Sequence, residues 1–412
     1  MTDPDPQSPP KQRLLSLDAF RGFDIAAMLL VNMTWSREHF HPQLFHIDWN
    51  DPAQGATLTD LVFPWFLFIA GAAIPLSMRS GRGRAQSASK KILIAFRRAV
   101  VIYLLGVLIT VVGEWYDRPM AWTDLTRWNI LQLIGAAYFV CVCVYLLPKW
   151  AQISFVALIL AGKWALMTGV PWDWVATLAD ARAQPDSPTG PATWRHFHGV
   201  REWVNGATLE PGFARSSAAW FGMAQQFLPC AAIAVLGGFT TEFLTSERSS
   251  GARAARAFAF GVALTLLAYV LQWGYDPAGD GLLGRATVPF SKWFFSPAYC
   301  LLASGTGAVL YAAFFFVIDA KGWTSAWALR VYGLNAIALY VGAEFTFKVF
   351  WSRWKLTNPE GNAGSFAGSS MDWLASWCGP PVIGLSLWVA LYLLAWWLVC
   401  FALYRKKIFI KV

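Results

Sequence analysis

The chain has 412 residues and a formal net charge of +9; only 14% of its residues are charged, while 56% are hydrophobic. A typical soluble chain carries about 25% charged residues, so this composition excludes a disordered, fibrous or ordinary cytosolic protein. It indicates a polytopic membrane protein, in which the 24 Trp and 30 Phe would enrich the membrane interfaces. The positive charge suits contact with anionic lipid headgroups, so we expect membrane lipid, and no nucleic acid, among the partners.

Ten apolar runs come close to the length of about 20 residues that a membrane-spanning helix needs. We therefore expect an all-α polytopic membrane protein with about ten transmembrane helices. The six cysteines fall mostly inside these runs and form no C-x-x-C motif, which favours a packing role. The predicted helices cover residues 20–36, 59–78, 94–113, 128–147, 151–169, 218–244, 256–273, 297–318, 327–350 and 381–404.

Basic residues cluster in the connections 79–98 and 246–256 and in the C-terminal segment 405–412. If the N-terminus lies inside, all three clusters face the cytoplasm, as the positive-inside rule requires. An even number of crossings then makes both termini cytoplasmic. We expect residues 1–15 to be a disordered cytoplasmic tail, 16–404 to form a single transmembrane domain and 405–412 to be a basic cytoplasmic tail.

In this orientation every histidine of the chain lies in an outer connection. Long connections are uncommon unless they are functional, so we expect any chemistry near the outer face. One alternative is a zinc site built from the two H-x-H pairs. Such pairs are also common by chance, and we predict no metal. The histidines are His39, His41, His46, His196 and His198.

The first two predicted helices hold several polar residues, and ionisable groups within membrane spans are costly and suggest function by default. Asp18, Arg21 and Asp24 lie toward the inner end of the first helix, and Asn32 lies near its outer end. Asp60 opens the second helix, where capping of the helix and a role in chemistry are both open.

His46 is flanked by the apolar residues Leu44, Phe45 and Ile47 on a connection between two apolar helices. That setting favours burial at the membrane interface, where a neutral imidazole can act as a base or a nucleophile. Asp60 could orient one ring nitrogen. The alternative is a solvated loop histidine without function.

Basic residues near the inner helix ends could bind the phosphates of an anionic cofactor, or equally lipid headgroups. These are Arg21, Arg97 and Arg98. One further lysine, Lys292, precedes the eighth predicted helix within the aromatic segment VPFSKWFFSPAY.

Two blocks, RLLSLDAFRG from residue 13 and DLVFPWFLFIAG from residue 60, enclose a helical asparagine and a loop histidine. This order resembles the catalytic domain of the heparan-α-glucosaminide N-acetyltransferase family and its bacterial relatives. The resemblance implies an integral membrane enzyme that takes an acetyl group from cytosolic acetyl-CoA to an amino sugar across the membrane. It also implies that His46 is the active histidine and that Asn32 and Asp60 match the family's asparagine and aspartate.

Some positions depart from the family pattern. Leu133 stands where the family has an arginine, and the spacings on both sides of His46 are longer than in the eukaryotic enzyme. These differences lie mostly in the sugar-facing loops, so they bear on the acceptor more than on the reaction.

We therefore predict a multi-pass acetyltransferase of the bacterial inner (plasma) membrane, with acetyl-CoA as donor and an amino sugar or cell-envelope glycan as acceptor. Asn32 would orient His46 or hydrogen-bond the acyl oxygen, and Asp60 would fix the imidazole tautomer. A homo-oligomer is left open. The alternative from another class is a non-catalytic transporter or flippase for a sugar or lipid-linked substrate, with His46 as a gate.

Overall fold

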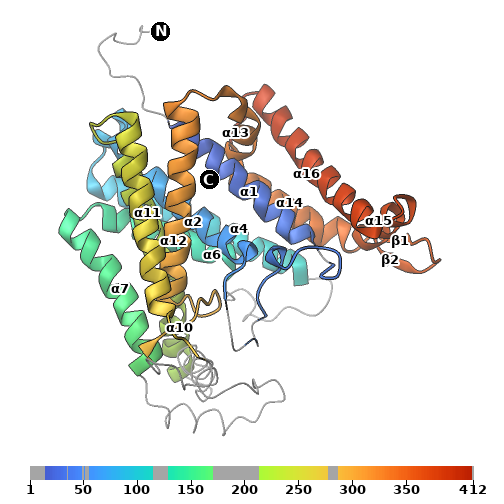
Figure 1. Cartoon of the computed structure of the whole chain (residues 1–412), viewed down its shortest axis with the longest axis horizontal. Helices are drawn as coiled ribbons and strands as arrows, with labels where there is room; N and C mark the ends of the chain where they lie inside the picture. Colours follow the sequence, from blue (N-terminus) through green and yellow to red (C-terminus); the bar gives the residue numbers. More distant parts are fainter. Residues whose placement is uncertain are drawn as a thin grey trace.

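Helices make up nearly all the regular structure of the computed structural model (Figure 1), which describes residues 14–34, 36–48, 51, 55–114, 129–169, 213–276 and 286–410. The first half contains α1 (Leu15–Met33), η1 (Pro42–Leu44), α2 (Leu58–Arg79), α3 (Gly81–Arg84), α4 (Ala88–Glu114), α6 (Ile130–Tyr145) and α7 (Lys149–Gly169). The second half contains α10 (Phe213–Leu244), α11 (Ser250–Gln272), α12 (Pro297–Phe314), η3 (Phe315–Ala320), η4 (Thr324–Ala326), α13 (Trp327–Gly333), α14 (Ala336–Thr346), η5 (Phe347–Trp351), β1 (Lys355–Thr357), β2 (Ala363–Ser365), α15 (Phe366–Trp377) and α16 (Pro381–Arg405).

Seven of the described helices are long and apolar enough to cross a membrane: α2, α4, α7, α10, α11, α16 and the helix formed by α12 with η3. They fall into two groups. The apolar windows of α2, α10 and α12 are 72%, 72% and 61% buried inside the protein, whereas those of α4, α7, α11 and α16 are only 22–28% buried. The second group therefore exposes apolar side chains outward, as lipid-facing helices do. The predicted all-α polytopic membrane class is confirmed.

Each of the ten predicted ranges contains helix, but the ninth is not one continuous helix as predicted. The chain breaks between α13 and α14, where Asn335 has the non-helical angles φ −125° and ψ 32°. Its side-chain amide donates to the Ile408 carbonyl at 3.2 Å and accepts from the Ile410 amide at 2.8 Å. The C-terminal segment after α16 thus folds back onto the break, and these hydrogen bonds fix both.

The prediction also missed the small substructure between the last two predicted helices. There β1 and β2 form an antiparallel pair, followed by α15, which packs on α16. Of the predicted N-terminal tail, residues 1–13 lie outside the described residues, and α1 begins at Leu15. The number of crossings and the cytoplasmic location of the termini stay predictions.

α1 crosses α13 at very close range. A Cβ added at Gly22 would lie 1.7 Å from the Leu329 carbonyl oxygen, and one at Gly333 would lie 2.0 Å from the Asp18 carbonyl oxygen. Only glycine at both positions permits this backbone approach. The crossing holds Arg21 of α1 beside the break between α13 and α14.

Candidate active site

His46 lies in the connection between α1 and α2. This connection lies at the end of the bundle where α1 ends (Figure 1). Hydrogen bonds hold this connection close to both helices: Thr34 Oγ1 donates to the Leu44 carbonyl at 3.2 Å, and Thr57 Oγ1 to the Phe45 carbonyl at 2.8 Å. The guanidinium of Arg37 donates to the His46 carbonyl at 3.1 Å. The imidazole itself is 42% exposed, so a substrate can reach it.

Asp60 caps α2 and also contacts His46. Its Oδ2 accepts from the Thr57 amide at 3.2 Å, while the Thr57 hydroxyl accepts from the Asp60 amide, which together form a capping box at the start of α2. Its Oδ1 lies 2.7 Å from His46 Nδ1. The Asp60 side chain is only 2% exposed, so this carboxylate is held rigidly against the imidazole.

This contact assigns the tautomer of His46. An ionised carboxylate can only accept a hydrogen bond, so Nδ1 must carry the proton that points at Asp60. In the neutral ring the lone pair then resides on Nε2. A histidine oriented in this way can act through Nε2 as a general base or as a nucleophile.

Lys292 completes this cluster, and the sequence had given it no role. It lies in the turn before α12, with Nζ 3.2 Å from His46 Nδ1, 3.3 Å from His46 Nε2 and 4.0 Å from Asp60 Oδ1. Its side chain is 16% exposed. Burial lowers the pKa of the Lys292 ammonium from 10.5 to about 8, although the Asp60 carboxylate opposes this shift.

Asn32 lies at the exposed end of α1, where its amide donates to Glu344 Oε1 of α14 at 3.1 Å. The structure therefore brings Asp60 to His46, but directs this hydrogen bond of Asn32 toward α14. The proposed action of Asn32 on His46 or on an acyl oxygen stays a prediction.

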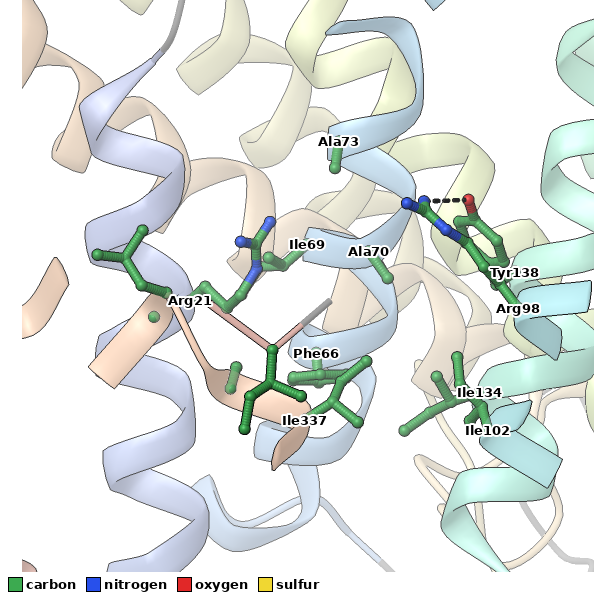
Figure 2. Close-up of a pocket in the computed structure, with 14 residues that line it drawn as sticks. Arg21, Phe66, Ile69, Ala70, Ala73, Arg98, Ile102, Ile134, Tyr138 and Ile337 are labelled. Atoms are coloured by element: carbon green, nitrogen blue, oxygen red, sulfur yellow. Dashed lines mark hydrogen bonds between the residues drawn. The ribbon is translucent and has the colours of Figure 1, made fainter. Parts of the chain in front are cut away.

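A second site, the inner pocket, lies deeper in the bundle between α1, α2, α4, α6 and the break before α14 (Figure 2). It is a cavity of about 240 Å³ whose walls include Arg21, Arg98, Tyr138 and Ile410. Arg21 reaches in from one side and Arg98 from the other, where Arg98 Nη1 donates to the Tyr138 hydroxyl at 3.2 Å. Two cations facing one cavity suit an anionic ligand.

The three predicted phosphate contacts are thus separated by the structure. Arg21 and Arg98 line the inner pocket, whereas Arg97 does not line it and lies on the exposed side of α4. Successive residues of a helix point about 100° apart, so neighbouring arginines on α4 cannot both face the same cavity. Arg97 is better suited to lipid headgroups at the membrane surface.

α2 connects the inner pocket to His46. The pocket residue Phe66 follows Asp60 by six positions, which corresponds to about 9 Å along a helix. The ligand-sized cavity and the histidine therefore lie at different depths along the same buried helix.

The zinc alternative has no support in the described residues, which contain no cluster of three or more His, Cys, Asp or Glu able to hold a metal. His39 Nδ1 lies 2.7 Å from the Ser36 hydroxyl, and His41 Nδ1 accepts from the Gln43 amide at 3.2 Å. His196 and His198 lie outside the described residues.

A larger cavity of about 810 Å³ lies between α7, α10, α11 and α12. Its walls are apolar apart from Lys149 and Glu242, which form an ion pair of 2.6 Å with each other. This lining suits hydrocarbon chains rather than a charged ligand.

Comparison with known proteins points to one family. Residues 13–187 match the family described as the catalytic region of heparan-alpha-glucosaminide N-acetyltransferase. Two enzymes of this name are similar to the chain at 24% identity, the human one over 97% of this chain and the mouse one over 99%. The chain spans about three fifths of their length, 60% and 62% respectively. The resemblance read from the sequence is confirmed: this multi-pass membrane protein is similar to the heparan-α-glucosaminide N-acetyltransferase catalytic family over residues 13–187, and at 24% identity to two enzymes of that name.

Proposed function

We propose that the protein transfers an acetyl group from acetyl-CoA, bound from the cytoplasmic side, to an amino sugar or glycan on the outer side of the membrane. The observation that carries this proposal is the His46–Asp60 pair, 2.7 Å apart, in which Nδ1 faces Asp60 and Nε2 carries the lone pair beside Lys292. The names of the relatives supply the reaction class and an amino-sugar acceptor. The bacterial inner membrane is part of the proposal.

The donor side of the proposal rests on the inner pocket. Arg21 and Arg98 give the cavity two cationic groups for phosphates, and Phe66, Ile69 and Ile134 give it an apolar wall for an uncharged chain. Its volume of about 240 Å³ accommodates part of an acetyl-CoA molecule and leaves the rest toward the surface. The basic clusters 79–98 and 405–412 are the reason for assigning this end to the cytoplasm.

The acceptor side rests on His46, whose imidazole is open to an incoming sugar while Asp60 holds the ring from behind. Nε2 can remove a proton from the acceptor amine as that amine attacks the thioester. Alternatively, Nε2 attacks the thioester itself and passes the acetyl group on from an acetyl-imidazole. The two routes differ in one observable, which is acetyl label on the protein when no acceptor is present.

The test is to incubate the purified full chain in detergent with radiolabelled acetyl-CoA and a panel of amino sugars and cell-envelope glycans. The proposal expects label in at least one acceptor, and stabilisation of the protein against heat by acetyl-CoA. If neither the protein nor any acceptor is labelled and acetyl-CoA does not raise Tm, the acetyltransferase proposal is wrong.

The transporter or flippase alternative makes opposite predictions. It expects substrate movement across proteoliposomes without consumption of acetyl-CoA, and it tolerates the loss of the His46 imidazole. Release of free CoA that depends on both His46 and an acceptor would exclude this alternative.

A further inference from the structure

The cation beside His46 is held by a chain segment far away in sequence. Lys292 lies 246 positions after His46, yet its Nζ reaches both ring nitrogens at 3.2 and 3.3 Å. Two further contacts join the same regions. Trp293 Nε1 donates to the Ile47 carbonyl at 3.3 Å, and the Tyr299 hydroxyl donates to the Asp60 carbonyl at 2.6 Å.

The turn that carries Lys292 is rigid. The Ser296 hydroxyl donates to the Pro289 carbonyl at 2.6 Å and accepts from the Ser291 amide at 3.2 Å. Phe295 has a positive φ of 47°, which is costly for a residue with a side chain, and its ring is buried against Phe63. A strained turn locked by buried contacts is typical of functional sites, where it fixes the direction of a side chain.

The Lys292 ammonium balances the charge of the buried Asp60 carboxylate from 4.0 Å, but at that distance it makes no hydrogen bond to the carboxylate. The Asp60 carboxylate accepts hydrogen bonds from His46 Nδ1 and the Thr57 amide, and the Thr57 hydroxyl lies 3.0 Å from Oδ2. Burying a lysine against an imidazole and a hydrogen-bonded carboxylate costs solvation energy that an apolar side chain would not lose. The group therefore fits a charge that forms during the reaction.

We propose that Lys292 is a catalytic residue whose ammonium donates a hydrogen bond to the carbonyl oxygen of the acetyl group while that oxygen carries negative charge. This inference rests on the proposed acetyl transfer. In the acetyl-imidazole route the acetyl carbon approaches Nε2, and in the base route it is attacked by an amine that Nε2 deprotonates. In both, the acetyl oxygen comes within reach of the Lys292 ammonium, which lies 3.3 Å from Nε2.

The electrons and protons balance in both routes. The attacking nitrogen forms a bond to the carbonyl carbon, and the π pair of the C=O bond moves onto oxygen, where Lys292 stabilises it. The pair then returns as the C–S bond breaks and sulfur leaves as a thiolate. In the base route, Nε2 returns to this thiolate the proton that it took from the amine. In the acetyl-imidazole route, the acceptor amine then adds to the same carbonyl carbon, and the collapse of this second adduct breaks the C–Nε2 bond and releases the imidazole. The proton that the amine loses is balanced by protonation of the released thiolate.

Only the protonated form of Lys292 can act in this way, so the proposal has a signature in pH. The groups that face Nζ are His46 from the connection after α1 and Asp60 from α2, with the Trp293 ring 5.8 Å away. The lowered pKa of about 8 means that the ammonium is lost as the pH rises through 8. Activity that needs it falls above pH 8.

The experiment compares Lys292→Met, Lys292→Arg and wild type by kcat and KM for acetyl-CoA across pH 6 to 10. Removing one oxyanion donor lowers kcat by about 10²–10³-fold, so Lys292→Met should lose this much with little change in KM. Lys292→Arg should keep more activity than Lys292→Met. In its profile of kcat against pH, the fall above pH 8 should disappear, because a guanidinium stays protonated. Lys149→Met, which removes a half-exposed lysine paired with Glu242, is the matched control and should behave as wild type.

Each outcome decides the matter. If wild type is inactive with every acceptor, the proposed function fails. If wild type is active and Lys292→Met has the same kcat, the proposed role of Lys292 is wrong. It is also wrong if kcat of Lys292→Arg falls above pH 8 as it does in wild type. If Lys292→Met does not fold, as judged by Tm, the pH profile of Lys292→Arg alone decides.

Discussion

The two carboxylate oxygens of Asp60 serve different partners: Oδ1 lies 2.7 Å from His46 Nδ1, and Oδ2 accepts the Thr57 amide at 3.2 Å and the Thr57 hydroxyl at 3.0 Å. The same residue thus starts a buried membrane helix and orients the imidazole. The position of His46 is thereby linked to the start of α2, because the same carboxylate contacts both.

These two roles of Asp60 can be separated by mutation. Asp60→Asn places an amide opposite Nδ1 and no longer favours the reactive tautomer, so acetyl transfer should fall by about 10²–10⁴-fold. Thr57→Ala breaks the capping box and should lower the free energy of unfolding by about 1 kcal/mol. Initial rates and thermal unfolding of both variants are the measurements, and Thr57→Ser, which keeps the hydroxyl, is the control. Equal loss of activity in Asp60→Asn and Thr57→Ala would contradict the separation.

His46→Ala should abolish turnover while leaving the fold intact. Its imidazole is 42% exposed, so truncation removes little buried surface, and Tm should stay within a few degrees of wild type. Acetyl-CoA binding should persist, because the inner pocket does not include His46. Release of free CoA and isothermal titration with acetyl-CoA check the two parts. Wild-type turnover in this variant would exclude His46 as the reacting group.

Arg98 and Arg97 form a matched pair of adjacent arginines. Arg98 lines the inner pocket and Arg97 does not, so only Arg98→Ala should weaken the binding of acetyl-CoA. A hydrogen bond to a charged group contributes about 1.5–3 kcal/mol, which corresponds to roughly tenfold to a hundredfold in Kd. Titration of both variants with acetyl-CoA tests this. Equal effects of the two substitutions would show that the cations act through the general surface charge rather than the pocket.

Stability should also depend on pH through Lys292. The ammonium has a pKa of about 8 in the folded protein, against 10.5 ordinarily, so between these values the unfolded chain binds more protons. The contribution of this lysine to stability therefore rises as the pH rises from 8 to 10.5. Lys292→Met should raise Tm relative to wild type at pH 7, and the difference should shrink toward pH 10. A difference in Tm that is constant from pH 7 to 10 would contradict the lowered pKa.

The sequence alone determined the class of the protein and singled out both members of its central pair, His46 and Asp60. Scarcity of charge and repeated apolar runs dictate membrane helices, because lipid cannot solvate polar side chains or an open backbone. The blocks around residues 13 and 60 carry the family resemblance that the comparisons confirm. Asp60 was recognisable because a carboxylate in the first turn of a helix leaves a local signal.

The tertiary structure decided what local patterns cannot encode. Asn335 interrupts a run that reads as one helix, because its amide bonds to a segment more than 70 positions away, at Ile408 and Ile410. Arg97 and Arg98 look alike in sequence, and only the rotation of α4 against its neighbours directs one into the inner pocket. Lys292 reaches His46 across 246 positions because α12 packs against α2. Composition and periodicity show which face of each segment is exposed to water or lipid. Contact between two side chains far apart in the sequence depends on how the helices pack together.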